Sequence, residues 1–171
     1  MITRNGKSWA ATHWHTLLDW WLNTYPGPGG TASYWYSLDP VTVQSENALG
    51  ALGDNAVVSG DIAADLLAPW RRPTRATIYS PQGANLAEHG FTPTSNRSDA
   101  TLTLISPRDE GLYLPASWRV GNTNLADPIQ VLYDIHLHNS GDASDAAKTL
   151  VEALMGRHRQ RWQQATGNDH D

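Results

Sequence analysis

The sequence contains no cysteine among its 171 residues, which excludes a disulfide scaffold, a thiolate zinc site and a cysteine nucleophile. Basic residues are also scarce: 12 Lys and Arg stand against 17 Asp and Glu, for a net charge of −5. That balance excludes a generally basic nucleic-acid binder, although it allows a local basic patch. No apolar run approaches the roughly 20 residues of a membrane-spanning helix, and the first residues lack the apolar core of a signal peptide. We therefore expect a cytoplasmic protein that does not enter a membrane.

The aromatic residues that are present are mostly amphipathic. The sequence has eight Trp and six Tyr but only one Phe. Trp and Tyr join a large apolar body to a polar group, so they are typical of interfaces and half-buried sites. The same bias also fits a small core in a protein of skewed composition. With 40% hydrophobic residues, the chain is long enough for one domain with a hydrophobic core, or for two small ones.

Apolar residues at helical spacing predict a first helix over residues 13–25. One stripe of that helix is formed by Trp14, Leu17, Leu18, Trp21 and Leu22. The prolines and glycines at 26–30 must end it, and they favour a turn over a phosphate-binding loop.

Later helices are predicted from their start signals. They lie over 41–52, over 62–67 after a cap by residues 59–61, from Pro128 with Asp127 as its cap, and over about 143–163. The helix that starts at Pro128 is expected to carry one buried stripe, made of Ile129, Leu132, Tyr133 and His136.

Short runs rich in β-branched and aromatic residues predict strands at 33–38, 56–58, 75–80, 101–105 and 112–114, with a short helix at 85–89. The alternation of Thr and Leu at 101–105 predicts a strand with one solvent-facing side. Because strands and helices mix without regular βαβ spacing, we predict an α+β fold with a small, mostly antiparallel sheet packed with helices and a helical C-terminal third. The expected organisation is a loose lead-in over 1–12, one domain over 13–164 and a polar tail over 165–171.

Histidine pairs and acidic pairs are the candidates for metal or acid–base chemistry. The histidine pairs are His13 with His15 and His136 with His138; the acidic pairs are Asp61 with Asp65 and Asp142 with Asp145. Histidines two apart on a helix point to different sides, and acids at helix starts are favoured as caps. Nucleophile-elbow, dinucleotide-binding and phosphate-loop motifs are absent from the sequence. We therefore expect no catalytic residue, metal or cofactor, with a metal-dependent enzyme as the weaker alternative.

Basic residues gather in two places. Arg71, Arg72 and Arg75 follow Trp70, and Arg157, Arg159 and Arg161 precede Trp162. Arginines interleaved with tryptophan can bind phosphates and stack on bases, so nucleic acid is a possible partner. Dipole compensation at a helix end explains the second cluster equally well.

Three segments in order carry a family resemblance. They are Val57–Asp65, Pro73–Tyr79, and Ala126–Ile135 followed by Ala143–Leu154. Their order resembles the C-terminal domain of AbiEi-type antitoxins of type IV toxin–antitoxin systems and related bacterial transcriptional regulators. The resemblance spans roughly residues 13–155, and the matching positions are Gly60, Ala63, Ala64, Pro128, Gln130, Tyr133 and Asp134.

The matching positions also have physical roles of their own. Gly60 permits a tight turn from strand to helix, and small residues at Ala63 and Ala64 permit close helix–sheet packing. Gln130 and Asp134 lie four residues apart, so they can hydrogen-bond each other or a partner.

The resemblance implies a regulatory role. Members of that family join a winged helix-turn-helix to this kind of domain, repress their own operon and counteract a nucleotidyltransferase-type toxin without a stable complex. Because 12 residues of this sequence precede residue 13, we expect no winged helix before it. We therefore expect a non-enzymatic regulatory or antitoxin-like domain, with a separately encoded DNA-binding protein or toxin-system component as its partner. A nucleic-acid-binding protein that uses the Arg and Trp clusters is the main alternative.

Overall fold

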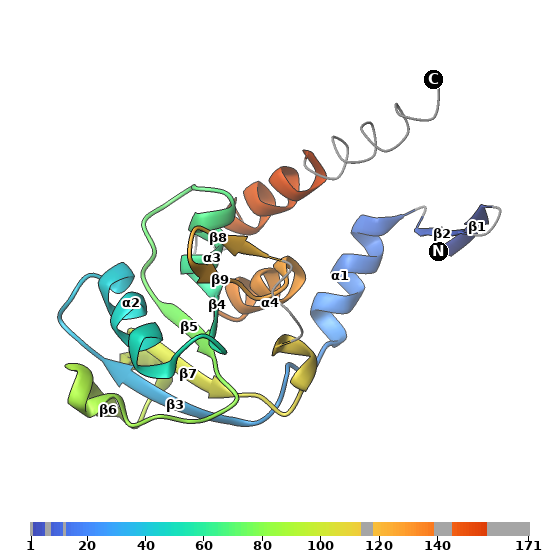
Figure 1. The fold of residues 1–171 in the computed structure, drawn as a ribbon. Helices are drawn as coiled ribbons and strands as arrows, with labels where there is room; N and C mark the ends of the chain where they lie inside the picture. The colour runs from blue at the N-terminus through green and yellow to red at the C-terminus, as the bar shows by residue number, and fades with distance from the viewer. Residues whose placement is uncertain (1, 6–7, 12, 114–117, 139–144, 157–171) are drawn as a thin grey trace, which may run out of the picture.

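The computed structural model describes residues 2–5, 8–11, 13–113, 118–138 and 145–156 (Figure 1). Its centre is a five-stranded sheet in the order β4-β5-β7-β3-β6. The strands are β3 (Thr31–Tyr36), β4 (Val57–Ser59), β5 (Ala76–Tyr79), β6 (Thr92–Thr94) and β7 (Leu102–Ser106). Only β5 and β7 run parallel; the other three pairings in this sheet are antiparallel. The predicted α+β class with a mostly antiparallel sheet is confirmed.

The helices lie close to their predicted positions. They are α1 (Trp14–Thr24), α2 (Val41–Leu52), α3 (Gly60–Leu67) and α4 (Pro128–His138). A further helix, here called the C-terminal helix, covers residues 145–156. The predicted continuation of that helix to residue 163 lies outside the described residues. In Figure 1, α1, α4 and the C-terminal helix lie on the side of the molecule away from β6. None of the described helices is long and apolar enough to cross a membrane.

The N-terminal residues are paired, so the prediction of a loose lead-in over 1–12 is wrong. β1 (Ile2–Asn5) and β2 (Ser8–Ala11) form an antiparallel ladder in which Asn5 lies opposite Ser8. The signal in the sequence is Gly6 directly after Asn5, because glycine is favoured at the first position of a two-residue connection between hairpin strands.

The strand β7 is buried on both faces, which its alternating sequence did not predict. Leu102 and Leu104 lie in the core, but Thr103 on the other face is only 6% exposed. Thr103 lies opposite Thr77 of β5, which is also buried. The cause is cover by a helix: Thr77 shares its face of β5 with Tyr79, whose hydroxyl bonds to Asp134 of α4 (Pro128–His138). A period-two pattern shows which side chains share a face, but it does not show whether that face is covered.

Leu112 and Tyr113 are not extended, unlike in the predicted strand over 112–114, whose last residue lies outside the described residues. A 3-10 helix covers Glu110–Tyr113 instead. The carboxylate of Asp109 accepts the backbone N–H of Gly111 at 2.9 Å, and this local bond stabilises a turn over an extended chain. After it, β8 (Arg119–Val120) and β9 (Thr123–Asn124) form a small hairpin that the sequence analysis did not find.

The helix α4 buries a different set of residues from the predicted stripe. Leu132 and Tyr133 are buried as expected, but Ile129 is 38% exposed and His136 is exposed. The other buried side chains of α4 are Gln130, Val131, Asp134 and Ile135. This wide buried face follows from its position, because α4 packs against α3, β4 and α1.

The turn after α1 depends on glycines. Gly27 has a φ of 87°, and a Cβ there would lie 2.7 Å from the Tyr133 hydroxyl. Gly30 has a φ of 94°, and a Cβ there would overlap the carbonyl oxygen of Ser106. Both positions combine a left-handed backbone with close approach of another segment. The predicted turn at 26–30 is therefore also a packing contact.

We expect Gly30→Ala to destabilise the fold strongly. Strain at a positive φ costs about 1–3 kcal/mol, and the overlap with Ser106 adds to it. Gly83→Ala is the matched control, because a Cβ at Gly83 meets no atom within 4 Å. Urea unfolding monitored by tryptophan fluorescence measures both variants. Equal stability of Gly30→Ala and wild type would contradict the packing described here.

Candidate functional site

A buried polar cluster joins the sheet to α4. Its four members, here called the Asp134 cluster, are Ser59, Tyr79, Gln130 and Asp134, and each is at most 4% exposed. Polar groups so deep in a core must be hydrogen-bonded to one another, because water cannot reach them. The cluster is therefore the first place to look for either chemistry or a structural constraint.

Three elements bring the cluster together. Ser59 ends β4 and Tyr79 ends β5; Val57 lies opposite Tyr79, so Ser59 and Tyr79 project from the same face of the sheet. Gln130 and Asp134 lie one turn apart on α4. The start of α4 is held by the Asp127 carboxylate, which accepts the backbone N–H of Ile129 at 2.8 Å. The predicted cap by Asp127 is thus confirmed.

Every hydrogen bond to Asp134 comes from a neutral donor. The Ser59 hydroxyl donates to Oδ2 of Asp134 at 2.5 Å, and the Tyr79 hydroxyl donates to Oδ1 at 2.8 Å and Oδ2 at 2.9 Å. The Gln130 amide donates to Oδ1 at 3.2 Å and also to the Tyr79 hydroxyl at 3.0 Å. The predicted bond between Gln130 and Asp134 is therefore confirmed, while the roles of Ser59 and Tyr79 were not anticipated.

Burial controls the protonation of this cluster. Loss of water around Asp134 raises its pKa to about 6, although the donated hydrogen bonds of Ser59, Tyr79 and Gln130 favour the carboxylate and lower it. Burial, with the negative charge of Asp134 nearby, raises the pKa of Tyr79. A carboxyl group with such a pKa suits acid–base catalysis. Here, however, both oxygens are bound within the protein, and Asp134 is 3% exposed. The arrangement holds α4 against the sheet.

An aromatic cluster ties α1 to α4 beside these polar groups. Trp21 stacks on Tyr25 with ring centroids 4.4 Å apart, and Tyr25 meets the ring of Tyr133 edge-on at 4.8 Å. Trp21 also approaches Tyr133 edge-on at 6.1 Å. Such pairs add to the hydrophobic contribution of the rings. Tyr133, one of the positions on which the family resemblance was based, therefore acts as a packing residue in this structure.

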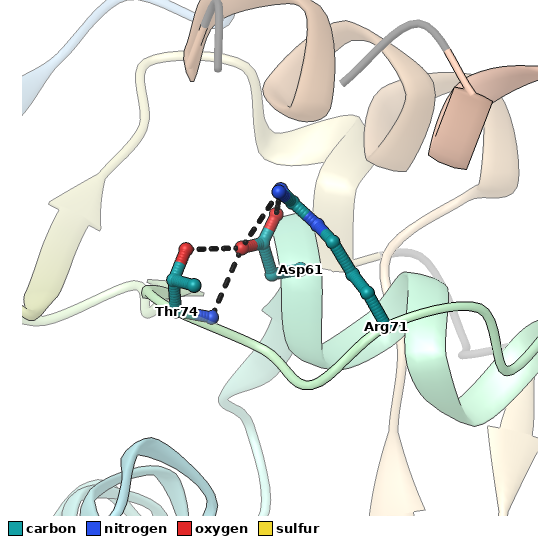
Figure 2. A network of polar contacts seen from close by, with 3 residues as sticks. All are labelled: Asp61, Arg71 and Thr74. Atoms are coloured by element: carbon teal, nitrogen blue, oxygen red, sulfur yellow. Dashed lines mark hydrogen bonds and ion pairs between the residues drawn. The ribbon is translucent and has the colours of Figure 1, made fainter. Parts of the chain in front are cut away.

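A second polar cluster, shown in Figure 2, fixes the loop that leads from α3 to β5. Arg71 lies 3.3 Å from Oδ1 of Asp61. Thr74 donates its hydroxyl to Oδ2 of Asp61 at 2.9 Å and its backbone N–H at 3.1 Å. Asp61 lies inside the first turn of α3, which begins at Gly60, so the prediction that Asp61 caps this helix is wrong. Its carboxylate therefore holds the loop, through Thr74 and the guanidinium of Arg71, rather than capping the helix.

The first predicted basic cluster is divided between different tasks. Arg71 pairs with Asp61, and Arg75 donates to the carbonyl oxygens of Arg97 at 2.7 Å and Ser98 at 2.8 Å. Arg72 is exposed, as is Trp70. The second predicted cluster, made of Arg157, Arg159, Arg161 and Trp162, lies outside the described residues.

The small residues that match the family behave as predicted. Gly60 has a φ of 61°, a left-handed conformation at the junction of β4 and α3 that favours glycine. Ala63 and Ala64 are buried, and α3 packs against both α4 and β5. The close approach therefore involves a helix as well as the sheet. Pro128 is the first residue of α4.

The candidate metal ligands do not converge in the described residues. His13, His15 and His136 are exposed, and the side chain of His138 is outside the described set, as is Asp142. In the part of the chain that the structure describes, no group of three His, Asp or Glu side chains could hold a metal ion.

An apolar groove lies between α1, the start of α4 and the C-terminal helix. It has a volume of about 300 Å³ and a mostly apolar lining. Its walls include Trp14 and Leu18 of α1, Ile129 and Leu132 of α4, and Leu154 of the C-terminal helix. Trp14, Leu18, Ile129 and Leu132 lie on the apolar faces predicted for their helices, but a pattern along the chain does not show that these faces surround an open groove.

Comparisons with known proteins found no relative of this chain. No family model matches the sequence, and no curated protein or solved structure matches it either.

We expect the stability of the protein to depend on the ionisation of Asp134. The folded-state pKa of about 6 lies above the unfolded value of 3.8, so the folded protein binds this proton more tightly. The stabilisation is complete below the unfolded pKa and is lost as the pH rises through about 6, a change of about 2–4 kcal/mol. Asp134→Asn removes this part of the pH dependence, whereas Asp39→Asn, at an exposed position, retains it. Urea unfolding between about pH 4 and pH 7 measures the difference; an unchanged slope in Asp134→Asn would contradict the assignment.

We also expect the two neighbouring arginines to differ sharply. Arg71→Ala leaves the buried Asp61 carboxylate without its cation and destabilises the fold by about 2–3 kcal/mol, less than for a fully buried pair because the Arg71 side chain is 20% exposed. Arg72→Ala, at an exposed position, changes stability by less than about 0.5 kcal/mol. Thermal and urea unfolding of both variants provide the comparison. Similar losses in the two variants would exclude the role assigned to Asp61.

Proposed function

We propose that this chain is a non-enzymatic regulatory domain of the antitoxin type, from a bacterial toxin–antitoxin or transcriptional control system. One observation carries the proposal: the Asp134 cluster joins the first and third segments of the family resemblance through Ser59, Gln130 and Asp134. The segments that resemble those regulators thus meet in space. Ser59, Gln130 and Asp134, which lie in these segments, hold α4 to the sheet, as expected for motif positions that specify a fold.

The chemistry of the same cluster also supports a non-catalytic role. Asp134 is the described carboxyl group best suited to acid–base work, but a substrate would have to displace Ser59, Tyr79 or Gln130 to reach it. The metal-dependent alternative relied on Asp61, Asp65 or the histidine pairs. The carboxylate of Asp61 is bound by Arg71 and Thr74, and among the described residues no group of three such side chains could hold a metal ion. Regulation through binding surfaces requires neither group to be accessible.

A nucleic-acid-binding role is the second candidate. Trp70 is 56% exposed and lies with Arg72 at a hollow of about 600 Å³ between the start of α2 and the loop after α3. An exposed tryptophan beside an arginine can stack a base and contact a phosphate. Asp65 lines the same hollow, however, and offsets part of the positive charge. The regulatory proposal is therefore preferred.

The regulatory proposal predicts that this gene lies beside a nucleotidyltransferase gene. Expression of that neighbour alone is expected to arrest bacterial growth, and co-expression of this chain is expected to restore it. The folding-defective variant Gly30→Ala is expected to fail, whereas Gly83→Ala restores growth like the wild type. Colony counts after induction measure the effect. Arrest that persists although the wild-type chain accumulates in soluble form would overturn the proposal.

A further inference from the structure

The apolar groove between α1, α4 and the C-terminal helix is lined by four segments of the chain. Trp14 comes from α1, Leu132 from α4 and Leu154 from the C-terminal helix, while Trp118 comes from the residues before β8. The backbone at Trp118 is held in place, because its carbonyl oxygen accepts the N–H of Leu125 at 2.9 Å. The lining therefore combines two tryptophans and several aliphatic side chains that lie far apart in the sequence.

The volume of the groove suits a small molecule better than a protein surface. It is about 300 Å³, at the lower end of the range of roughly 300–1,000 Å³ that is typical of small-molecule sites. A stable protein interface uses roughly 20–30 residues on each side, which is far more than a hollow of this volume can contact. Such sites also form preferentially between the helices of bundles, as this one does.

The charges around the groove select an uncharged occupant. Among the described residues, Asp127 is the only charged residue of the lining, and its carboxylate already caps α4. Lys148, which is exposed, lies one turn before Val151 of the lining and brings a charge of the opposite sign. Asp19 and Glu152 each follow a lining residue directly, so they point about 100° away from it. An ion would thus lose its hydration in a mostly apolar groove without meeting a matching net charge.

We propose that this groove is a binding site for an uncharged apolar small molecule that carries an aromatic ring system. Rings of the ligand pack against Trp14 and Trp118, and such aromatic pairs gain more than their buried area alone provides. The ligand also adds apolar contacts to α1, which has no buried residue and packs mainly on α4. The site goes beyond the proposed regulatory function and does not depend on it.

Three naphthylamine probes that differ in charge test the class of ligand. They are N-phenylnaphthylamine, which is uncharged, anilinonaphthalenesulfonate, an anion with the same rings, and naphthylethylenediamine, a cation at neutral pH. Each is titrated with the full chain and followed by its own fluorescence. The uncharged probe is expected to bind saturably, with one molecule per chain and at least about tenfold more tightly than either ion, because only the ions lose hydration of a charge. At saturation it is expected to raise the melting temperature, because it binds the folded chain.

Two exposed aliphatic residues provide matched variants. Ile129→Asn places an amide in the lining and is expected to weaken binding of N-phenylnaphthylamine by about tenfold. Leu38→Asn, at a position 90% exposed outside the groove, is expected to leave binding unchanged. Cooperative thermal melting shows that each variant is folded before it is titrated, and the charge series on the wild type needs no variant. Unsaturable binding of the uncharged probe, or a folded Ile129→Asn variant that binds it as well as the wild type, overturns the proposal.

The remaining outcomes identify other occupants. Tightest binding of the cation means that Asp127 controls the site, and tightest binding of the anion means that Lys148 does; either result overturns the uncharged class. Sedimentation that shows a dimer of the chain, lost in Ile129→Asn but not in Leu38→Asn, overturns the proposal in favour of a second copy. None of these measurements involves growth, so they decide the groove assignment separately from the regulatory function.

Discussion

The arrangement of this structure depends on one carboxylate in the core, that of Asp134. Asp134 can remain in a nearly water-free position only if hydrogen-bond donors surround it, and those donors come from β4, β5 and α4. The bonds specify where α4 lies relative to the sheet, which purely apolar contacts would specify less strictly. Since α4 in turn supports α3, α1 and one wall of the groove, its placement determines the arrangement of all the helices on that side.

Each of the two polar clusters holds a different part of the chain in place. The Asp134 cluster fixes a helix to strands, while Asp61 fixes the loop that leads into β5. In both clusters the carboxylate is already bound within the protein, and the second cluster uses Asp61 and Arg71, which were candidates for metal and phosphate binding in the sequence. Arg71 shows this most clearly: as part of an arginine run it suggests a phosphate contact, but beside a buried carboxylate it neutralises a charge. Among the described residues, the groove has a mostly apolar lining and the hollow beside α2 has a mixed one.

Those surfaces gather on helices. Trp14 and Leu18 of α1, with Ile129 of α4, contribute to one groove, and Trp70 stands apart at the hollow beside α2. The tryptophan and tyrosine residues, which outnumber phenylalanine, thus fall into a buried group and an exposed group. The rings of Tyr79 and Tyr133 are buried in the core near Asp134, whereas the side chains of Trp20 and Trp70 remain largely exposed to water. Exposed tryptophans such as those of the second group are enriched at binding interfaces.

Local signals in the sequence determined the helices, most strands and the α+β class, because helix periodicity, caps and proline or glycine breaks act over a few residues. The bond between Gln130 and Asp134 was predictable for the same reason, as both lie on one helix turn. Only the tertiary structure decided that Ser59 and Tyr79 complete the Asp134 cluster. It also decided that the side chain of Thr103 is buried and that Asp61 binds Arg71. These outcomes depend on contacts between residues far apart in the chain, and a pattern along the chain records which faces are apolar but not what covers them.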